Sequence, residues 1–106
     1  ELKHGPIALI EKDTVVIALA TQPSVAQKTI SNILETVARG AKVILIASQN
    51  QNTEGFEYVI RIPDVDPLLS CIPATVLLQE LAYYVAKEKG CDVDKPRNLA
   101  KSVTVE

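Results

Sequence analysis

Two uninterrupted apolar runs, one on each side of an amphipathic segment, constrain the fold of this chain more than any other feature. Residues 15–19 read Val-Val-Ile-Ala-Leu and residues 43–46 read Val-Ile-Leu-Ile. Neither run has the polar alternation of a strand with one face in water. Such runs are typical of strands that are covered on both faces of a parallel sheet. They therefore predict a buried sheet.

The segment between these runs has the spacing of a helix that packs on that sheet. Ser24 and Gln27 form a capping-box pattern at its start, and Gly40 stands beyond its end as a C-terminal cap. Apolar side chains recur at helical intervals, namely at Ile30, Ile33, Leu34, Val37 and Ala38. Strand, helix and strand together predict a βαβ unit.

Residues 57–62 alternate in polarity, which suits a third strand nearer an edge of the sheet. One face carries Tyr58, Ile60 and Ile62, the other carries Glu57, Val59 and Arg61, and Pro63 ends the run. The link from Ser48 to Gly55 is short for a parallel crossover, which usually needs a dozen or more residues. The residues themselves leave the direction of this strand open.

Residues 67–89 form the longest helical pattern, with Pro73 in the first turn of its main part and Gly90 beyond its end. Its apolar side chains cover more than one stripe, so one sheet face cannot hide them all. We expect part of this helix to meet another domain or subunit. The apolar residues are Val76, Leu77, Leu78, Leu81, Ala82, Tyr84 and Val85.

The size and charge of the chain bound its class. With 106 residues it forms one domain at most, and 47% hydrophobic and 23% charged residues are ordinary for a soluble globular protein. A net charge of −2, with both signs interspersed, predicts no nucleic-acid partner and no membrane partner. No apolar run approaches the ~20 residues that span a bilayer. The absence of Met at position 1 indicates a piece of something longer.

The two cysteines are predicted to be free thiols in a reducing compartment. Cys71 and Cys91 lie near opposite ends of the long predicted helix. About 20 residues of helix separate them by about 30 Å, which is far beyond the reach of a disulfide.

No cofactor or metal site is predicted. Ser48-Gln49 follows a strand, but neither a glycine nor a helix N-terminus follows within reach, so a phosphate loop is not indicated. Asp92 and Asp94 are too few ligands for calcium or magnesium, and capping together with pairing to Arg97 explains them better. The chain contains no CxxC, GxGxxG or P-loop motif.

The two ends of the chain carry motifs that packing does not explain. Near the carboxyl end, a Pro-restricted turn leads into Asn98-Leu99-Ala100-Lys101-Ser102 and then Val103-Thr104-Val105-Glu106. The amino end reads Lys3-His4-Gly5-Pro6. At both ends the sequence resembles the glutamine:fructose-6-phosphate aminotransferases (isomerizing), also called glucosamine-6-phosphate synthases.

This resemblance implies an α/β fold, the flavodoxin-like three-layer α/β/α sandwich of sugar-isomerase (SIS) domains, with a parallel sheet that includes strand 57–62. The chain would be an incomplete half-domain, with residues 1–91 in the second SIS subdomain and residues 92–106 as an extended catalytic tail. The implied parent is a cytoplasmic homodimer that needs no metal or organic cofactor. It converts fructose 6-phosphate and glutamine to glucosamine 6-phosphate and glutamate.

The resemblance also assigns site residues. Lys101 would form a Schiff base with open-chain fructose 6-phosphate and bind this substrate together with Ala100. An unperturbed lysine, with a pKa near 10.4, is only about 0.1% neutral at physiological pH, so burial or a nearby cation must lower the pKa. His4 would assist ring opening in the site of a neighbouring subunit, because a near-neutral pKa suits proton transfer.

Other parts of the implied site are absent from this chain. The proton-shuttling glutamate of the family lies upstream of the histidine motif, so Glu1 is interpreted as structural. The sugar-phosphate loop belongs to the preceding SIS half-domain, and the ammonia source is a glutaminase domain. The isolated chain is therefore expected to be inactive.

Two other functions remain open. One is a non-catalytic SIS module that binds a phosphosugar as a regulatory ligand, although such a module has no need of Lys101. The other is a dimerisation or interaction scaffold that offers the apolar helix around Leu77 and Val85 to a partner.

Overall fold

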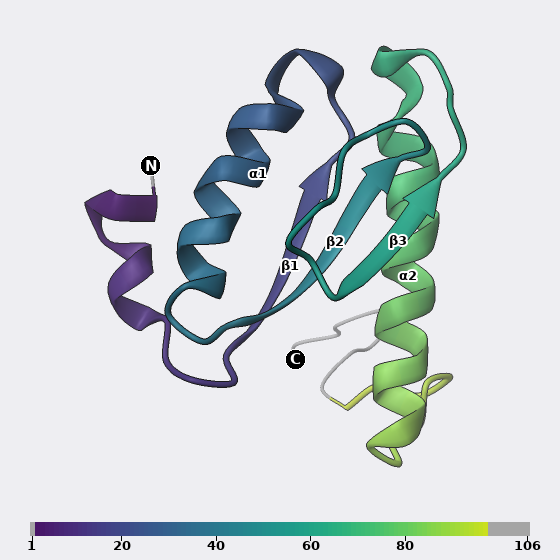
Figure 1. Ribbon diagram of the computed structural model, residues 1–106. Coiled ribbons are helices and arrows are strands. Elements are labelled where there is room, and N and C mark those ends of the chain that lie inside the picture. The colour runs from purple at the N-terminus through teal and green to yellow at the C-terminus, as the bar shows by residue number, and fades with distance from the viewer. Residues whose placement is uncertain (1, 98–106) are drawn as a thin grey trace, which may run out of the picture. The chain divides into compact units, whose positions relative to one another are not determined.

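The protein is described from a computed structural model that covers residues 2–97 (Figure 1). A parallel sheet has the strand order β1-β2-β3, and helix α1 lies between β1 and β2 along the chain. The strands are β1 (Val15–Ala20), β2 (Lys42–Ser48) and β3 (Tyr58–Ile62); the α-helices are α1 (Pro23–Val37) and α2 (Cys71–Glu88); the 3-10 helices are η1 (Leu2–His4), η2 (Pro6–Leu9) and η3 (Pro67–Leu69).

The chain divides between Ala74 and Thr75 into two compact units. The first contains the sheet, α1 and the start of α2, and the second contains the rest of α2 and the residues after it. This division is not the one that was predicted between the SIS subdomain, residues 1–91, and the tail, residues 92–106. That boundary stays a prediction.

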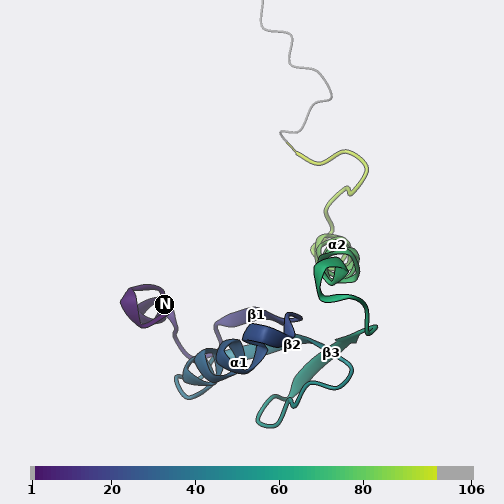
Figure 2. The ribbon, with the colours of Figure 1, turned by 90° about the horizontal axis from the view of Figure 1, so that it is seen from above.

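The core of the first unit lies between α1 and one face of the sheet (Figure 2). Every second residue of β1 and β2 points into it, because side chains of a strand alternate between faces. Leu45 and Ala47 are completely buried there, against Ala26 and Ile30 of α1. This arrangement confirms the predicted βαβ unit.

The start of α1 differs from the prediction. The residue that precedes the helix is Gln22, whose side chain makes no capping hydrogen bond, and Ser24 lies inside the first turn. The capping-box interpretation was therefore wrong. Pro23 explains the difference, because proline is pre-organised for the first helical position and has no N–H to be capped.

The end of α1 follows the prediction. Gly40 has a φ of 90°, and its N–H donates to the carbonyl of Val37. A Cβ atom at this position would lie 3.2 Å from the Cα of Lys12. Glycine is needed here both for the positive φ and for the close approach of the two backbones.

Strand β3 is parallel to β2, with Ile46 opposite Ile60. The resemblance implied this direction, which the residues had left open. No helix is needed in the connection because β3 is short. Five residues of strand rise about 16 Å, whereas residues 49–57 can span about 30 Å when extended.

Helix α2 follows η3, which Asp66 caps by accepting a hydrogen bond from the N–H of Leu68 at 2.9 Å. Pro73 stands in the first turn of α2, and Gly90 beyond its end has a φ of 69°, as predicted. Cys71 and Cys91 are both free and exposed. The free thiols predicted from the sequence are thus confirmed.

The apolar character of this helical region exceeds the expectation from the sequence. Pro67–Glu88, with a mean hydropathy of 1.4, is long and apolar enough by length and composition to cross a membrane. The statement that no apolar segment approaches this length was therefore wrong. A single such helix is weak evidence for a membrane protein, because core helices of soluble proteins pass the same test.

Candidate functional site

The predicted catalytic histidine lies at the amino end of the first unit. His4 is the last residue of η1 and is exposed, and Pro6 occupies the first position of η2. Gly5 joins the two short helices, with its N–H donating to the carbonyl of Leu2 at 3.2 Å. The Lys-His-Gly-Pro motif therefore forms a tight turn that presents the imidazole at the surface.

The other predicted site residues, Ala100 and Lys101, lie outside the described residues, as does Glu1. The segment that leads to the lysine is described as far as Arg97. Asp92 organises it, because one carboxylate oxygen accepts hydrogen bonds from the N–H groups of Asp94 and Lys95 at 3.0 and 3.1 Å. Asp92 thus closes a local turn, while the predicted pairing of Asp92 and Asp94 with Arg97 stays a prediction.

A hollow of about 780 Å³ lies within the second unit, between α2 and the first residues of the predicted tail. Tyr83 and Ala86 of α2 line one side, and Asp92, Lys95 and Arg97 line the other. Its volume is within the range of small-molecule sites, and it combines apolar walls with two cations.

The carboxyl ends of the strands, where ligands of open α/β sheets usually bind, are occupied by a network around Arg61. Its Nη1 donates to the carbonyls of Ser48, Gln49 and Gln51 at 2.8 to 2.9 Å, and its Nη2 donates to the Oγ1 of Thr53 at 2.9 Å. One guanidinium group thus holds the loop that follows β2.

Asp64 supports the same loop from the end of β3. Its carboxylate accepts hydrogen bonds from the N–H of Gln49 at 3.2 Å and from the side-chain amide of Asn50 at 2.9 Å. A phosphate bound at this loop would need the N–H groups of Gln49 and Asn50 as donors, but both groups already donate to the carboxylate of Asp64. The sequence interpretation, which found no phosphate loop at Ser48-Gln49, fits this geometry.

Gln22 links the carboxyl end of β1 to the segment before α2. Its side-chain amide donates to the carbonyl of Pro67 and to the Oγ of Ser70, both at 2.7 Å. Ser70 is almost completely buried. Sequence reasoning did not identify Gln22, Arg61 or Asp64; the one available signal was a single arginine in a short, otherwise apolar strand.

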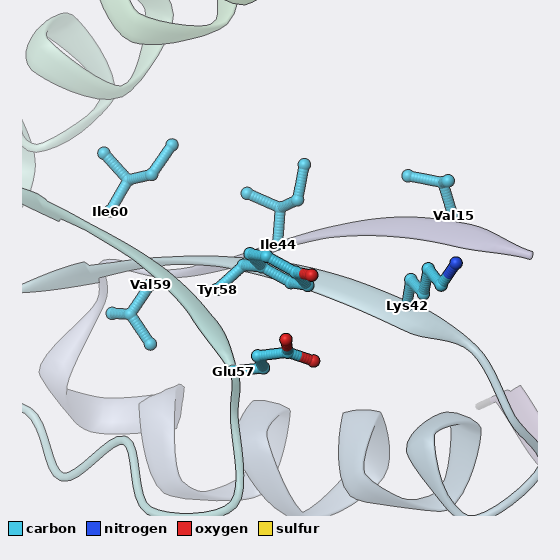
Figure 3. A pocket seen from close by; sticks show the side chains of 7 residues that line it. All are labelled: Val15, Lys42, Ile44, Glu57, Tyr58, Val59 and Ile60. Carbon is cyan, nitrogen blue, oxygen red and sulfur yellow. The ribbon is translucent and has the colours of Figure 1, made fainter. Parts of the chain in front are cut away.

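A second hollow, of about 500 Å³, lies over the amino ends of the strands (Figure 3). Val15, Ile44 and Ile60 point to the same side of the sheet in this view, while Glu57 and Val59 point to the other side. Polar groups stand at its rim. Lys42 forms an ion pair of 2.9 Å with Asp13, which raises the pKa of Lys42, and a hydrogen bond with Glu57 raises the pKa of Tyr58.

Among residues 2–97, no group of three or more His, Cys, Asp or Glu side chains is placed to hold a metal ion.

Comparison with known proteins identifies the family. Residues 1–85 match the SIS domain. The whole chain is 56% identical to part of a glutamine–fructose-6-phosphate aminotransferase (isomerizing) from Clostridium acetobutylicum and 52% identical to part of that of Methanosarcina acetivorans. In both cases it spans only 18% of the length of the relative.

A solved structure supports the fold. The C-terminal domain of glucosamine-fructose-6-phosphate aminotransferase from Francisella tularensis superposes with a TM-score of 0.79 at 35% identity, over 90% of this chain and 28% of that one. The predicted flavodoxin-like α/β fold is confirmed. The chain belongs to the SIS-domain family.

Proposed function

We propose that this chain is the carboxyl-terminal part of the isomerase domain of a glutamine:fructose-6-phosphate aminotransferase. The observation that carries the proposal is the match with the Clostridium acetobutylicum enzyme, which covers 100% of this chain and so includes both terminal motifs. The complete protein would form glucosamine 6-phosphate in the cytoplasm, as a homodimer with a glutaminase domain.

In this proposal Lys101 is the nucleophile. Its neutral amine attacks the C2 carbonyl of open-chain fructose 6-phosphate, and loss of water gives a Schiff base. The imine withdraws electrons from the neighbouring C1–H bond, which makes that proton acidic enough for isomerisation. Ala100, the residue before Lys101 in the sequence, contributes to the substrate site in this proposal.

His4 has a separate task. Fructose 6-phosphate is mostly cyclic, and ring opening needs a proton at the ring oxygen. An imidazole suits this transfer because its pKa lies near neutrality. The exposed position of His4 on η1 leaves it accessible to a second subunit, and we propose that it acts in the partner's site.

The scaffold function is the second candidate for the chain in isolation. Large apolar side chains of α2, among them Val76, Tyr84 and Val85, are exposed in the described part of the chain. This favours a surface that meets further polypeptide. Without the phosphate-binding half-domain, the 106-residue chain should show no turnover of fructose 6-phosphate.

The test is a pair of substitutions in the complete protein. Lys101→Ala should lower kcat for glucosamine 6-phosphate by roughly 10³-fold or more, while the Kd for fructose 6-phosphate changes little because the phosphate is held elsewhere. Lys95→Ala is the matched control and should keep kcat within a few-fold. Full activity of Lys101→Ala would refute the proposal.

A further inference from the structure

The hollow of about 780 Å³ after α2 has walls that are built by a defined turn of the backbone. Helix α2 ends in a Schellman motif, in which the N–H of Cys91 donates to the carbonyl of Ala86 and the N–H of Gly90 donates to that of Lys87, both at 2.9 Å. Gly90 has the positive φ of 69° that this motif requires. The chain thus reverses at Gly90, and Cys91 and Ala86 both line the hollow.

A second turn brings positive charge to the same hollow. The carboxylate of Asp92 accepts hydrogen bonds from the N–H groups of Asp94 and Lys95, which fixes the backbone there. The side chains of Lys95 and Arg97 line the hollow. The Schellman motif already satisfies two of the last carbonyls of α2, so neither cation is needed to cap them. Within residues 75–97 the hollow therefore presents two cations beside one carboxylate that the backbone already engages.

The opposite wall is aromatic and apolar. The ring centroid of Tyr83 lies 5.4 Å from that of Tyr84 at an interplanar angle of 77°, which is an edge-to-face contact. This contact restricts the ring of Tyr83, which is still 46% exposed. The rest of the apolar lining is Ala86, Val93 and Pro96. A flat apolar wall beside two cations suits an anion that also carries a compact organic part.

We infer that this hollow binds a phosphorylated sugar, at a site separate from the one in which Lys101 forms the Schiff base. Arg97 donates two parallel hydrogen bonds to the phosphate, and the ammonium of Lys95 adds a second positive charge. The sugar lies against the ring of Tyr83. The inference rests on the proposed function for its class of ligand. In that function the preceding half-domain holds the phosphate of the substrate, so these two cations are left for a second molecule.

Inorganic phosphate fits the hollow less well than a phosphorylated sugar. It would satisfy the cations but would leave the apolar wall around Tyr83 in water. A volume of about 780 Å³ is also in the range of sites for whole organic ligands. Binding should therefore be tighter for the sugar phosphate than for phosphate alone.

The two free thiols provide a test with an internal control. Cys91 is exposed and lines the hollow, whereas Cys71 is exposed at the start of α2 and is not among the lining residues. In the complete protein, the substrate site is first blocked by borohydride trapping of fructose 6-phosphate on Lys101. Glucosamine 6-phosphate is then added, and peptide mass spectrometry follows the alkylation of each thiol by iodoacetamide. At ten times the Kd, alkylation of Cys91 should slow about tenfold, because only the free site reacts, and that of Cys71 should not change.

A pair of arginine substitutions assigns the protection to the hollow. Arg97→Gln should raise the glucosamine 6-phosphate concentration for half-protection of Cys91 at least about tenfold, because the charged, bidentate donor is lost. Arg39→Gln is the matched control, since Arg39 lies in the first unit and donates to the carbonyl of Glu35. This variant should keep the concentration of the unsubstituted protein.

Four results would overturn the inference. These are an unchanged alkylation rate of Cys91, an equal slowing at Cys71, an unaltered half-protection concentration in Arg97→Gln, and equal protection by inorganic phosphate. Because the assay needs no turnover, its failure is separate from that of the proposed function. A protein that protects Cys91 but shows neither a trapped sugar nor aminotransferase activity would refute the proposed function alone.

Discussion

At the scale of single residues, the pKa of Tyr58 at the amino end of β3 depends on the charged side chains beside it. Tyr58 forms a hydrogen bond with Glu57, and the negative charge of the carboxylate further disfavours a phenolate. Both effects raise the pKa of Tyr58 above its ordinary value of 10.0, while the nearby Lys42 opposes them. The interaction of Tyr58 with Glu57 stabilises the folded state only while the phenol of Tyr58 is protonated. Its contribution to the free energy of unfolding is therefore complete below pH 10.0 and is lost as the pH rises through the raised pKa.

This predicts a measurable midpoint. The phenolate absorbance of the protein minus that of Tyr58→Phe should give a titration midpoint above 10.0. Glu57→Gln should move the midpoint down toward 10.0, because the amide keeps a hydrogen-bonding group but not the charge. Glu54→Gln is the control and should not move it. A midpoint at or below 10.0 in the unsubstituted protein would contradict this account.

At the scale of elements, Arg61 is the residue that makes the loop after β2 a defined structure. Three carbonyls and one hydroxyl of residues 48–53 converge on its guanidinium. A lysine keeps the charge but cannot reproduce the planar fork. The sequence indicated only that Ser48-Gln49 does not start a phosphate loop, and the structure adds that an arginine of the next strand holds this segment.

Arg61→Lys should therefore loosen this loop selectively. We expect limited proteolysis to cleave within residues 49–55 at least about ten times faster than in the unsubstituted protein, because protease sites are loop tips with few contacts. Arg39→Lys is a matched control, since the guanidinium of Arg39 donates to the carbonyl of Glu35 in the last turn of α1. Equal cleavage rates in both variants would show that the Arg61 network does not order the loop.

The elements themselves were largely predictable, because each strand and helix is set by a local pattern. The apolar runs gave β1 and β2, and the periodicity gave α1. The direction of β3 was not predictable from the residues, since it depends on the path of a loop without secondary structure. The hydrogen-bond partners of Arg61 could not be predicted for another reason. Three of them are backbone carbonyl oxygens, and because every residue has such an oxygen, the sequence does not mark them.

The candidate site was less predictable than the fold. The periodicity and burial of the chain carry no information about Lys101, His4 or Ala100, which became candidates only through a resemblance at the two ends. The structure places His4 on η1 and leaves Ala100 and Lys101 outside the described residues. The roles of these residues stay predictions, which substitution and covalent trapping experiments test.

At the scale of the whole molecule, the proposed sharing of a site between subunits makes a further prediction. Complete proteins that carry His4→Ala or Lys101→Ala should each be inactive. Random subunit exchange at equal amounts should restore about a quarter of the sites, because half of the dimers are mixed and each mixed dimer has one intact site. Exchange must be verified independently, for example by native mass spectrometry. Mixtures that stay inactive would place His4 outside the partner's site.

The central claim is that Lys101 forms a covalent bond with a sugar phosphate, and reductive trapping tests it most directly. The complete protein is treated with borohydride in the presence of fructose 6-phosphate, which converts a Schiff base into a stable secondary amine. Peptide mass spectrometry then locates the added sugar. The account predicts one sugar per chain, on Lys101, and none without substrate. A label on Lys3 or Lys95, or no label in an active protein, would contradict it.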